Sequence, residues 1–151
     1  MINRKTKLLK LMNFWPPLLG AGIHVDFMSK DFLRVDVSMK LRFWNRNYVN
    51  THYGGSLYSM TDPFYMLMLM QVLGREYIVW DKAASIRFKK PGTGRVHAIF
   101  ELLPEQIEKI KMDVLSQNKV EPVFTIEVRD ETGDVVALVE KVLYIKLKAI
   151  K

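Results

Sequence analysis

The sequence predicts an α+β fold, in which an antiparallel sheet of about six strands wraps a long central helix and an extra N-terminal helix precedes the sheet. Segments of alternating apolar and polar residues, typical of strands with one buried face, occur in neighbouring pairs. The stretch from Ser56 to Leu73 is apolar on nearly every side, which favours a helix buried on most sides. Residues 1–151 are expected to form a single domain of this class.

The first element is expected to be a helix over residues 5–15, which places Leu8, Leu11, Met12 and Trp15 on one face. Pro16-Pro17 is predicted to end this helix, because proline lacks the backbone N–H that the helix requires. Residues 1–17 are therefore interpreted as a helical extension that docks on the domain. Its basic residues also allow an amphipathic segment that lies on a membrane surface.

The strands are predicted from alternation and from the turn residues between them. Residues 23–28 and 34–41 form the first hairpin, with Ile23, Val25 and Phe27 facing one way and Val35, Val37, Met39 and Leu41 facing the core. Residues 77–88 and 95–103 follow as the third and fourth strands, with a turn at Gly92-Thr93-Gly94. Residues 121–129 and 135–147 are the fifth and sixth, joined by a tight turn. Between the two pairs, residues 104–117 start with proline and place Ile107, Ile110 and Val114 on one helical face.

Composition and charge exclude several classes of function. The chain has no cysteine, which excludes disulfides, a thiolate nucleophile and cysteine-based metal sites. His24, His52 and His97 have no metal-like spacing, so no metal is expected. The net charge of +7 comes from the two ends, residues 1–10 and 141–151, which contain no acid. Because the middle is close to neutral, we expect no nucleic-acid partner, and binding of nucleic acid or an anionic membrane by the ends stays a minor alternative.

No membrane-spanning segment is expected. The longest apolar run, residues 63–73, is well below the roughly 20 residues that a spanning helix needs. The N-terminus does not have the uninterrupted apolar region of a secretion signal, because Lys10 divides it. A cytoplasmic location is therefore the expectation.

The segment of residues 47–63 brings polar and glycine residues to the start of the buried helix. Gly54-Gly55 allow a ligand to approach the backbone closely, and free N–H groups at a helix start favour an oxyanion. Asp62 lies within the apolar stretch, where a buried carboxylate needs a partner. Two structural alternatives stay open: the helix begins at Pro63 with Asp62 as its N-cap, or it begins near Gly55 and Pro63 kinks it. For the glycine pair the alternative is a plain turn.

The layout and this segment resemble the hotdog-fold acyl-CoA thioesterases of the phenylacetate-pathway type and an uncharacterised branch similar to the C-terminal domain of YiiD. Those families carry an Asn, then approximately G-T-x-H-G-G, then an Asp seven positions after the second Gly. Asn47, Gly54-Gly55 and Asp62 match that pattern. The motif His is replaced by Tyr53, although His52 is adjacent, and only Thr51 of the "G-T" is kept.

The resemblance implies hydrolysis of an acyl thioester. Asp62 would act as general base or nucleophile, the Gly55 N–H would polarise the thioester carbonyl, and Asn47 would orient the water or the carbonyl. The residues implied to contact substrate are Tyr53, His52, Gly54 and Met66, with Arg87, Lys89 and Lys90 near the phosphates of CoA. A solvated turn is the alternative for the basic residues, and a place in the core for Met66.

The implied partners are an acyl-CoA or acyl-carrier thioester and further copies of the same chain. The CoA moiety would be part of the substrate, and no separate cofactor is expected. The site would lie between subunits of a homodimer or a dimer of dimers. The main alternative is a non-catalytic module that binds acyl-CoA or fatty-acyl groups, and the missing motif His favours it.

Overall fold

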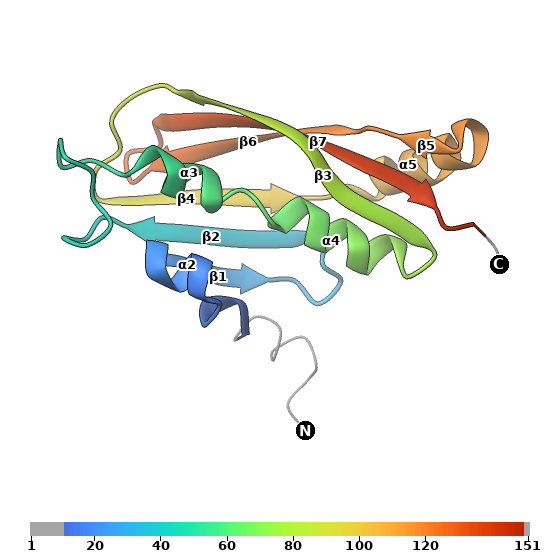
Figure 1. Cartoon of the computed structure of the whole chain (residues 1–151), viewed down its shortest axis with the longest axis horizontal. Helices are drawn as coiled ribbons and strands as arrows, with labels where there is room; N and C mark the ends of the chain where they lie inside the picture. Colours follow the sequence, from blue (N-terminus) through green and yellow to red (C-terminus); the bar gives the residue numbers. More distant parts are fainter. Residues whose placement is uncertain (1–10, 150–151) are drawn as a thin grey trace.

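The computed structural model describes residues 11–149, which form one antiparallel sheet with helices on it (Figure 1). The strand order is β1-β2-β4-β6-β7-β3, and the short β5 pairs with β7. The strands are β1 (Ile23–Met28), β2 (Arg34–Lys40), β3 (Tyr77–Phe88), β4 (Arg95–Glu101), β5 (Lys119–Val120), β6 (Val123–Asp130) and β7 (Val135–Leu147). The helices are α2 (Pro16–Ala21), α3 (Gly54–Ser59), α4 (Phe64–Leu73) and α5 (Pro104–Gln117). The α+β class is confirmed.

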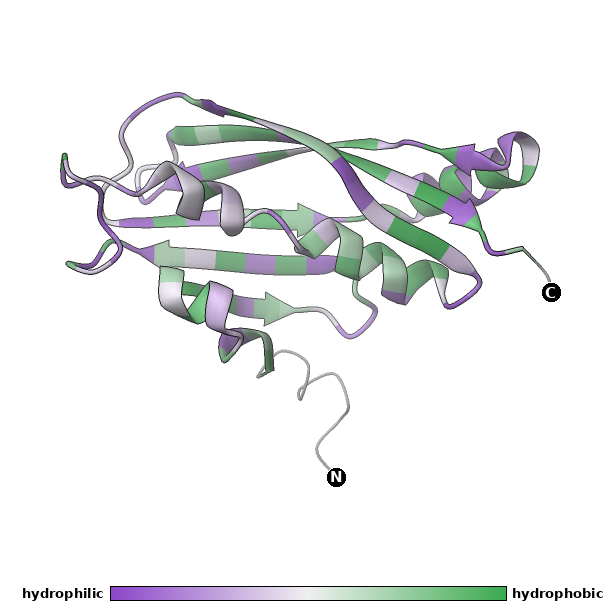
Figure 2. Ribbon diagram, viewed as in Figure 1, coloured by the Kyte–Doolittle hydropathy of each residue, from purple (hydrophilic) through white to green (hydrophobic). Residues whose placement is uncertain are grey.

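The core lies between the sheet and the helices that cross it. Apolar and polar residues alternate along the strands (Figure 2), so that one face of the sheet is apolar. Phe64 of α4 packs on Phe100 of β4 with ring centroids 4.9 Å apart, and Tyr65 lies 4.4 Å from Phe124 of β6. These aromatic contacts place α4 on the inner face of the sheet.

The central helix begins at Gly54, as the alternative of a start near Gly55 predicts, but at Pro63 it is broken into two helices and not merely kinked. The first piece, α3, begins at Gly54 and ends at Ser59, and Pro63 is the N-cap of α4. Proline has no N–H to donate to the Ser59 carbonyl and disfavours helical backbone in the residue before it. The Ser59 carbonyl instead accepts from the Asp62 N–H at 3.3 Å, and Asp62 caps no helix.

The N-terminal helix ends before Pro16, as predicted, but this region differs from the prediction in two other respects. Pro16 and Pro17 open a second helix, α2, because the first turn of a helix tolerates proline. On the predicted apolar face Met12 is buried, whereas Leu11 and Trp15 are exposed. Residues 5–10 of that helix, and the basic residues at the start of the chain, lie outside the described residues.

The strands depart from the prediction at five places. A bulge after Val25 turns Phe27 to the exposed face, and β2 ends at Lys40, one residue before Leu41. The connection at Gly92–Gly94 is no hairpin turn, because β3 pairs with β7 while β4 pairs with β2 and β6. The fourth strand, predicted to reach Leu103, ends at Glu101. The predicted fifth strand, residues 121–129, begins at Val123 as β6, and the short β5 before it at residues 119–120 was not predicted, so the sheet has seven strands. Among residues 11–149 no helix has the length and apolarity to cross a membrane.

Candidate functional site

The break between α3 and α4 is held by Lys141, a residue that the sequence analysis did not single out. Lys141 lies on β7, and its side chain is completely buried. Its Nζ donates to the carbonyl oxygen of Asp62 at 2.6 Å and to Oδ1 of Asp62 at 2.8 Å. The same Nζ lies 3.0 Å from Oδ1 of Asp81 on β3. One ammonium group therefore joins two strands to the helix break.

The charges of this cluster are coupled. Burial by itself would lower the pKa of Lys141, but the contacts with Asp62 and Asp81 outweigh it and the pKa is raised. Burial raises the pKa of the Asp81 carboxyl, and the repulsion from Asp62 adds to this, while Lys141 opposes both. Lys141 is thus a charged, fully paired ammonium and not a nucleophile.

Asp62 has one oxygen anchored and the other free of protein. Oδ1 accepts from Lys141 and from the hydroxyl of Tyr58, which lies 2.9 Å away. Burial raises the pKa of that hydroxyl, and its hydrogen bond to Asp62 does the same. The Asp62 side chain is 47% exposed, and Oδ2 has no hydrogen-bond partner in the part of the chain that the structure describes. Such a carboxylate can accept a proton or a hydrogen bond from a ligand.

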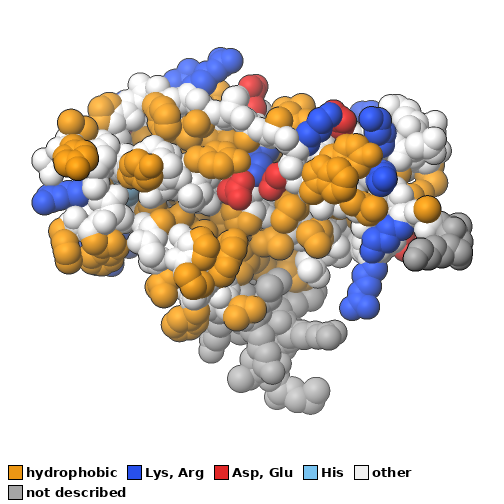
Figure 3. Space-filling view, viewed as in Figure 1, with side chains coloured by type: hydrophobic (Ala, Val, Ile, Leu, Met, Phe, Trp, Pro, Cys, Tyr) orange, Lys and Arg blue, Asp and Glu red, His pale blue; other side chains and the backbone are white. Residues whose placement is uncertain are grey.

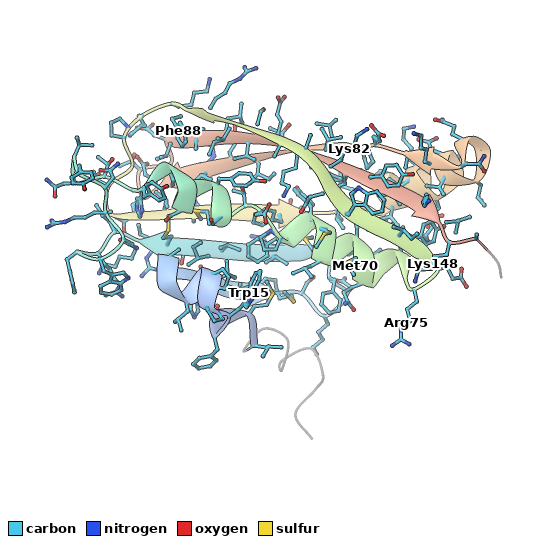
Figure 4. The ribbon with its side chains drawn as sticks, viewed as in Figure 1. Trp15, Met70, Arg75, Lys82, Phe88 and Lys148 are labelled. Atoms are coloured by element: carbon cyan, nitrogen blue, oxygen red, sulfur yellow. The ribbon has the colours of Figure 1, made fainter. Side chains whose placement is uncertain are left out.

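This carboxylate lies on an apolar face. Figure 3 shows hydrophobic side chains on both sides of a small group of charged ones, over α3, α4 and β3. Tyr53, Met70, Trp80 and Phe88 are each at least 45% exposed. Phe88 lies at the α3 end of β3, and Met70 lies on α4 (Figure 4). A surface of this composition suits an acyl group or a second protein chain.

Five of the predicted residues line a separate cleft of about 460 Å³ at the start of α3. They are Asn47, His52, Gly54, Lys89 and Lys90, together with Thr51, Leu57, Phe88, Pro91 and Gly92. Neither Asp62 nor Gly55 lines this cleft. Within one chain the predicted base, Asp62, therefore lies outside the cleft that four of the predicted substrate contacts line.

The glycine pair opens α3 and is not a plain turn. Gly54 and Gly55 are its first two residues, and neither has a positive φ. Their N–H groups have no intrahelical acceptor, as in the first turn of any helix. A Cβ on Gly54 would lie 2.8 Å from the Phe88 ring, and one on Gly55 would lie 2.5 Å from the Tyr53 ring. Both glycines thus allow an aromatic ring to lie against the helix start.

The side chain of Asn47 is used by its own loop. Its Nδ2 donates to Oγ1 of Thr51 at 2.9 Å, and its Oδ1 accepts from the N–H groups of Val49 and Thr51. This pattern closes the turn of residues 47–51. The second N–H of Nδ2 donates to the carbonyl oxygen of His52 at 3.4 Å, so Asn47 holds the loop beside the cleft and has no free donor to orient a water.

His52 connects that loop to the β3–β4 connection. Its ring is 3% exposed, and Nε2 lies 3.0 Å from the carbonyl oxygen of Gly94, which can only accept. The proton is thereby assigned to Nε2, and Nδ1 is buried without a partner among the described residues. Burial lowers the pKa of His52, against the hydrogen bond to Gly94, so the ring is neutral near pH 7.

The remaining predicted residues differ in whether their side chains are free to contact a ligand. Lys90 pairs with Asp130 at 2.7 Å and Asp134 at 2.8 Å, which occupies its ammonium in the β6–β7 turn. Arg87 and Lys89 are exposed, and their side chains have no partner in residues 11–149. Met66 is half-buried and packs against the core, which is the structural alternative for it.

One signal in the sequence could have identified Lys141. The inward positions of β7 alternate, and Val139, Lys141 and Leu143 are all fully buried. A lysine on such a face needs a buried partner, and Asp62 is a carboxylate in an equally apolar stretch. The sequence around Asp81 contains no comparable pattern that would indicate a buried carboxylate. Across residues 11–149 no three His, Asp or Glu side chains form a group that could hold a metal ion.

The family profile described as "Domain of unknown function (DUF4442)" matches residues 4–145. The chain belongs to this family. No curated protein matches the sequence.

Solved structures share the fold of this DUF4442 chain. A Pseudomonas aeruginosa protein of unknown function, described as a probable thioesterase, has a TM-score of 0.84 at 18% identity, over 98% of this chain and 99% of that one. A Haemophilus influenzae thioesterase has a TM-score of 0.68 at 14% identity, over 97% and 92%. The PaaI protein of the E. coli phenylacetic acid degradation operon has a TM-score of 0.63 at 18% identity, over 93% and 89%. The predicted hotdog fold and the resemblance to thioesterases of this fold are confirmed.

Replacing Lys141 by Met is expected to lower the free energy of unfolding by about 1–3 kcal/mol, because it leaves the half-exposed carboxylate of Asp62 and the more buried one of Asp81 without their cation. Urea denaturation followed by circular dichroism measures the change. Lys148, an exposed lysine just beyond the end of β7, is the matched control, and Lys148→Met should change stability by less than about 0.5 kcal/mol. Equal stabilities of the two variants would show that the cluster is not structurally important.

His52 makes the stability of the protein depend on pH. Its folded pKa lies below the unfolded value of 6.5, so the unfolded chain binds more protons and stability is lost as the pH falls below that value. His52→Gln should reduce this loss, and unfolding at a series of pH values measures it. An unchanged slope in His52→Gln would assign the loss to other groups.

Proposed function

We propose that this chain is a thioesterase that hydrolyses acyl thioesters of CoA or of acyl carrier protein, with Asp62 as its base. The observation that carries the proposal is the Asp62 carboxylate, anchored through Oδ1 at the helix break and open at Oδ2 on an apolar face. The fold shared with thioesterases supports it. The acyl chain would lie along the exposed apolar residues beside Asp62.

In the proposed reaction Asp62 Oδ2 accepts a proton from a water molecule, and the water oxygen bonds to the thioester carbonyl carbon. The resulting oxyanion is stabilised by backbone N–H groups at the start of α3, where Gly54 and Gly55 have no intrahelical acceptors. The carbon–sulfur bond then breaks, and the proton held by Asp62 passes to the departing thiolate. The products are a carboxylic acid and a thiol.

Asp62 and the α3 cleft lie apart in one chain, so we propose that the complete site forms between two copies. β3 is an edge strand of the sheet, with one neighbour, β7. Trp80 and Phe88 on β3 are 45% and 58% exposed. Pairing of two β3 edges would cover these residues and bring the Asp62 of one chain toward the cleft of the other. Lys89 and Arg87 would then offer their charges to the phosphates of CoA.

A binding module without turnover is the second candidate. Two observations favour it: Tyr53 stands where the motif has His, and the amide of Asn47 is used within its own loop. Such a module would bind an acyl-CoA on the same face and release it unchanged.

Replacing Asp62 by Asn is expected to lower kcat/KM for thioester hydrolysis by about 100-fold or more, because the base is removed while the shape is kept. Released thiol is measured for acetyl-, phenylacetyl- and palmitoyl-CoA. Asp26, a carboxylate of similar exposure on β1, gives the control variant Asp26→Asn, which should keep full activity. Full activity in Asp62→Asn contradicts the proposal. No turnover by the wild type, with a Tm raised by an acyl-CoA, supports the binding module.

The chain is expected to sediment as a dimer at micromolar concentration. Ala84 is exposed near the middle of β3, and Ala84→Arg should weaken the dimer about 10-fold or more, since two like charges would meet across the paired edges. Analytical ultracentrifugation measures the dissociation constant. Ile99→Arg, an equally drastic change at an exposed position on β4, is the control. A monomeric wild type would contradict the shared site.

A further inference from the structure

Lys141 makes two contacts with the same residue, one to the backbone and one to the side chain of Asp62. The helix break leaves the Asp62 carbonyl outside α4, and the buried ammonium donates to it at 2.6 Å. The second bond, at 2.8 Å, reaches Oδ1. A cation that holds both the peptide and the carboxylate restricts the side-chain rotamer as well as the position of the residue.

We propose that Lys141 is the positioning residue of the site: it turns Oδ1 of Asp62 inward and thereby presents Oδ2 to the substrate. The inference rests on the proposed role of Asp62 as base. Tyr58 completes the arrangement, because its hydroxyl donates to the same Oδ1 from the preceding turn. Lys141 itself touches no substrate, since its side chain is completely buried.

Asp81 competes with Asp62 for the ammonium. It pairs across the strands with Leu143, two residues from Lys141 on the same face of β7. Its Oδ1 lies 3.0 Å from Nζ but is not aligned for a hydrogen bond, and it is buried. Lys141 thus directs two hydrogen bonds at Asp62, while its ammonium lies as an ion-pair partner beside the carboxylate of Asp81. The cluster contains one ammonium, that of Lys141, and the two carboxylates of Asp62 and Asp81, so its net charge is negative.

Opposite effects on Asp62 follow from this competition. The titratable groups that face it are Tyr58 from α3, Asp81 from β3 and Lys141 from β7. Without Lys141 the two carboxylates repel each other, and Asp62 holds its proton to a higher pH. Without the charge of Asp81 the ammonium of Lys141 interacts with the carboxylate of Asp62 alone, and Asp62 loses its proton at a lower pH. A role for Lys141 in folding alone predicts neither shift.

The test uses the full chain as wild type, Lys141→Met, Asp81→Asn and the double variant. The carboxyl carbon of Asp62 is followed by carbon-13 NMR as the pH is changed. Its titration midpoint should be higher in Lys141→Met than in the wild type and lower in Asp81→Asn. Lys82→Met is the control, because Lys82 is an exposed lysine on β3 whose partner is Glu121, outside the cluster. In Lys82→Met the carboxyl group of Asp62 should titrate with the same midpoint as in the wild type.

Hydrolysis of the acyl-CoA substrate provides the second measurement. In Lys141→Met kcat should fall about 10-fold or more with little change in KM, and the acid limb of the pH profile should move to higher pH with the NMR midpoint. If Lys141→Met does not fold, the titration midpoint of Asp62 is compared between the wild type, Asp81→Asn and the double variant. The double variant removes both the ammonium and the competing carboxylate.

Two outcomes separate the positioning role from the proposed function. Midpoints that are the same in all variants overturn the positioning role, even if the wild type is an active thioesterase. A wild type with no turnover overturns the proposed function, and the titration then decides by itself whether Lys141 controls Asp62.

Discussion

The ammonium of Lys141 is buried among apolar strands, and its charge requires partners that the rest of the fold must deliver. β3 brings Asp81, and the interruption of the central helix brings both the carbonyl and the carboxylate of Asp62. A continuous helix would use that carbonyl in its own hydrogen bonds, so the break and the lysine depend on each other. Pro63 causes the break, because proline has no backbone N–H to donate to the carbonyl of Ser59.

The polar residues around the glycine pair have structural roles that differ from the role of Asp62. Asn47 and His52 are polar residues next to a glycine pair, yet their hydrogen bonds build the loop and tie it to Gly92 and Gly94. Lys90 is held in the β6–β7 turn. What the fold leaves open is one oxygen of Asp62, the start of α3, and an apolar face that reaches the edge strand β3. The proposed hydrolysis of an acyl thioester would use these features as its base, its oxyanion site and its apolar surface.

Most of the fold could be predicted from the sequence, because periodicity reports directly which side of a strand is buried. The predicted limits of β3, α5 and β7 match the structure, since alternation, an N-terminal proline and turn residues mark them. The prediction was wrong where the deciding contact is not local. Phe27 is exposed by a bulge, and the two strands beside Gly92-Thr93-Gly94 pair with distant partners, which no local pattern encodes.

The sequence by itself determined the α+β class, the buried helical region, the place of Asp62 within it and the absence of cysteine chemistry. Each follows from the order of residue types along the chain. Only the tertiary structure decided that Asp62 pairs with Lys141, 79 positions away, and that Asn47 and Asp62 do not share a cleft. Such pairings depend on strand order and on how the helix crosses the sheet. The energy of a buried charge is determined by its neighbours in space, whatever their distance in sequence.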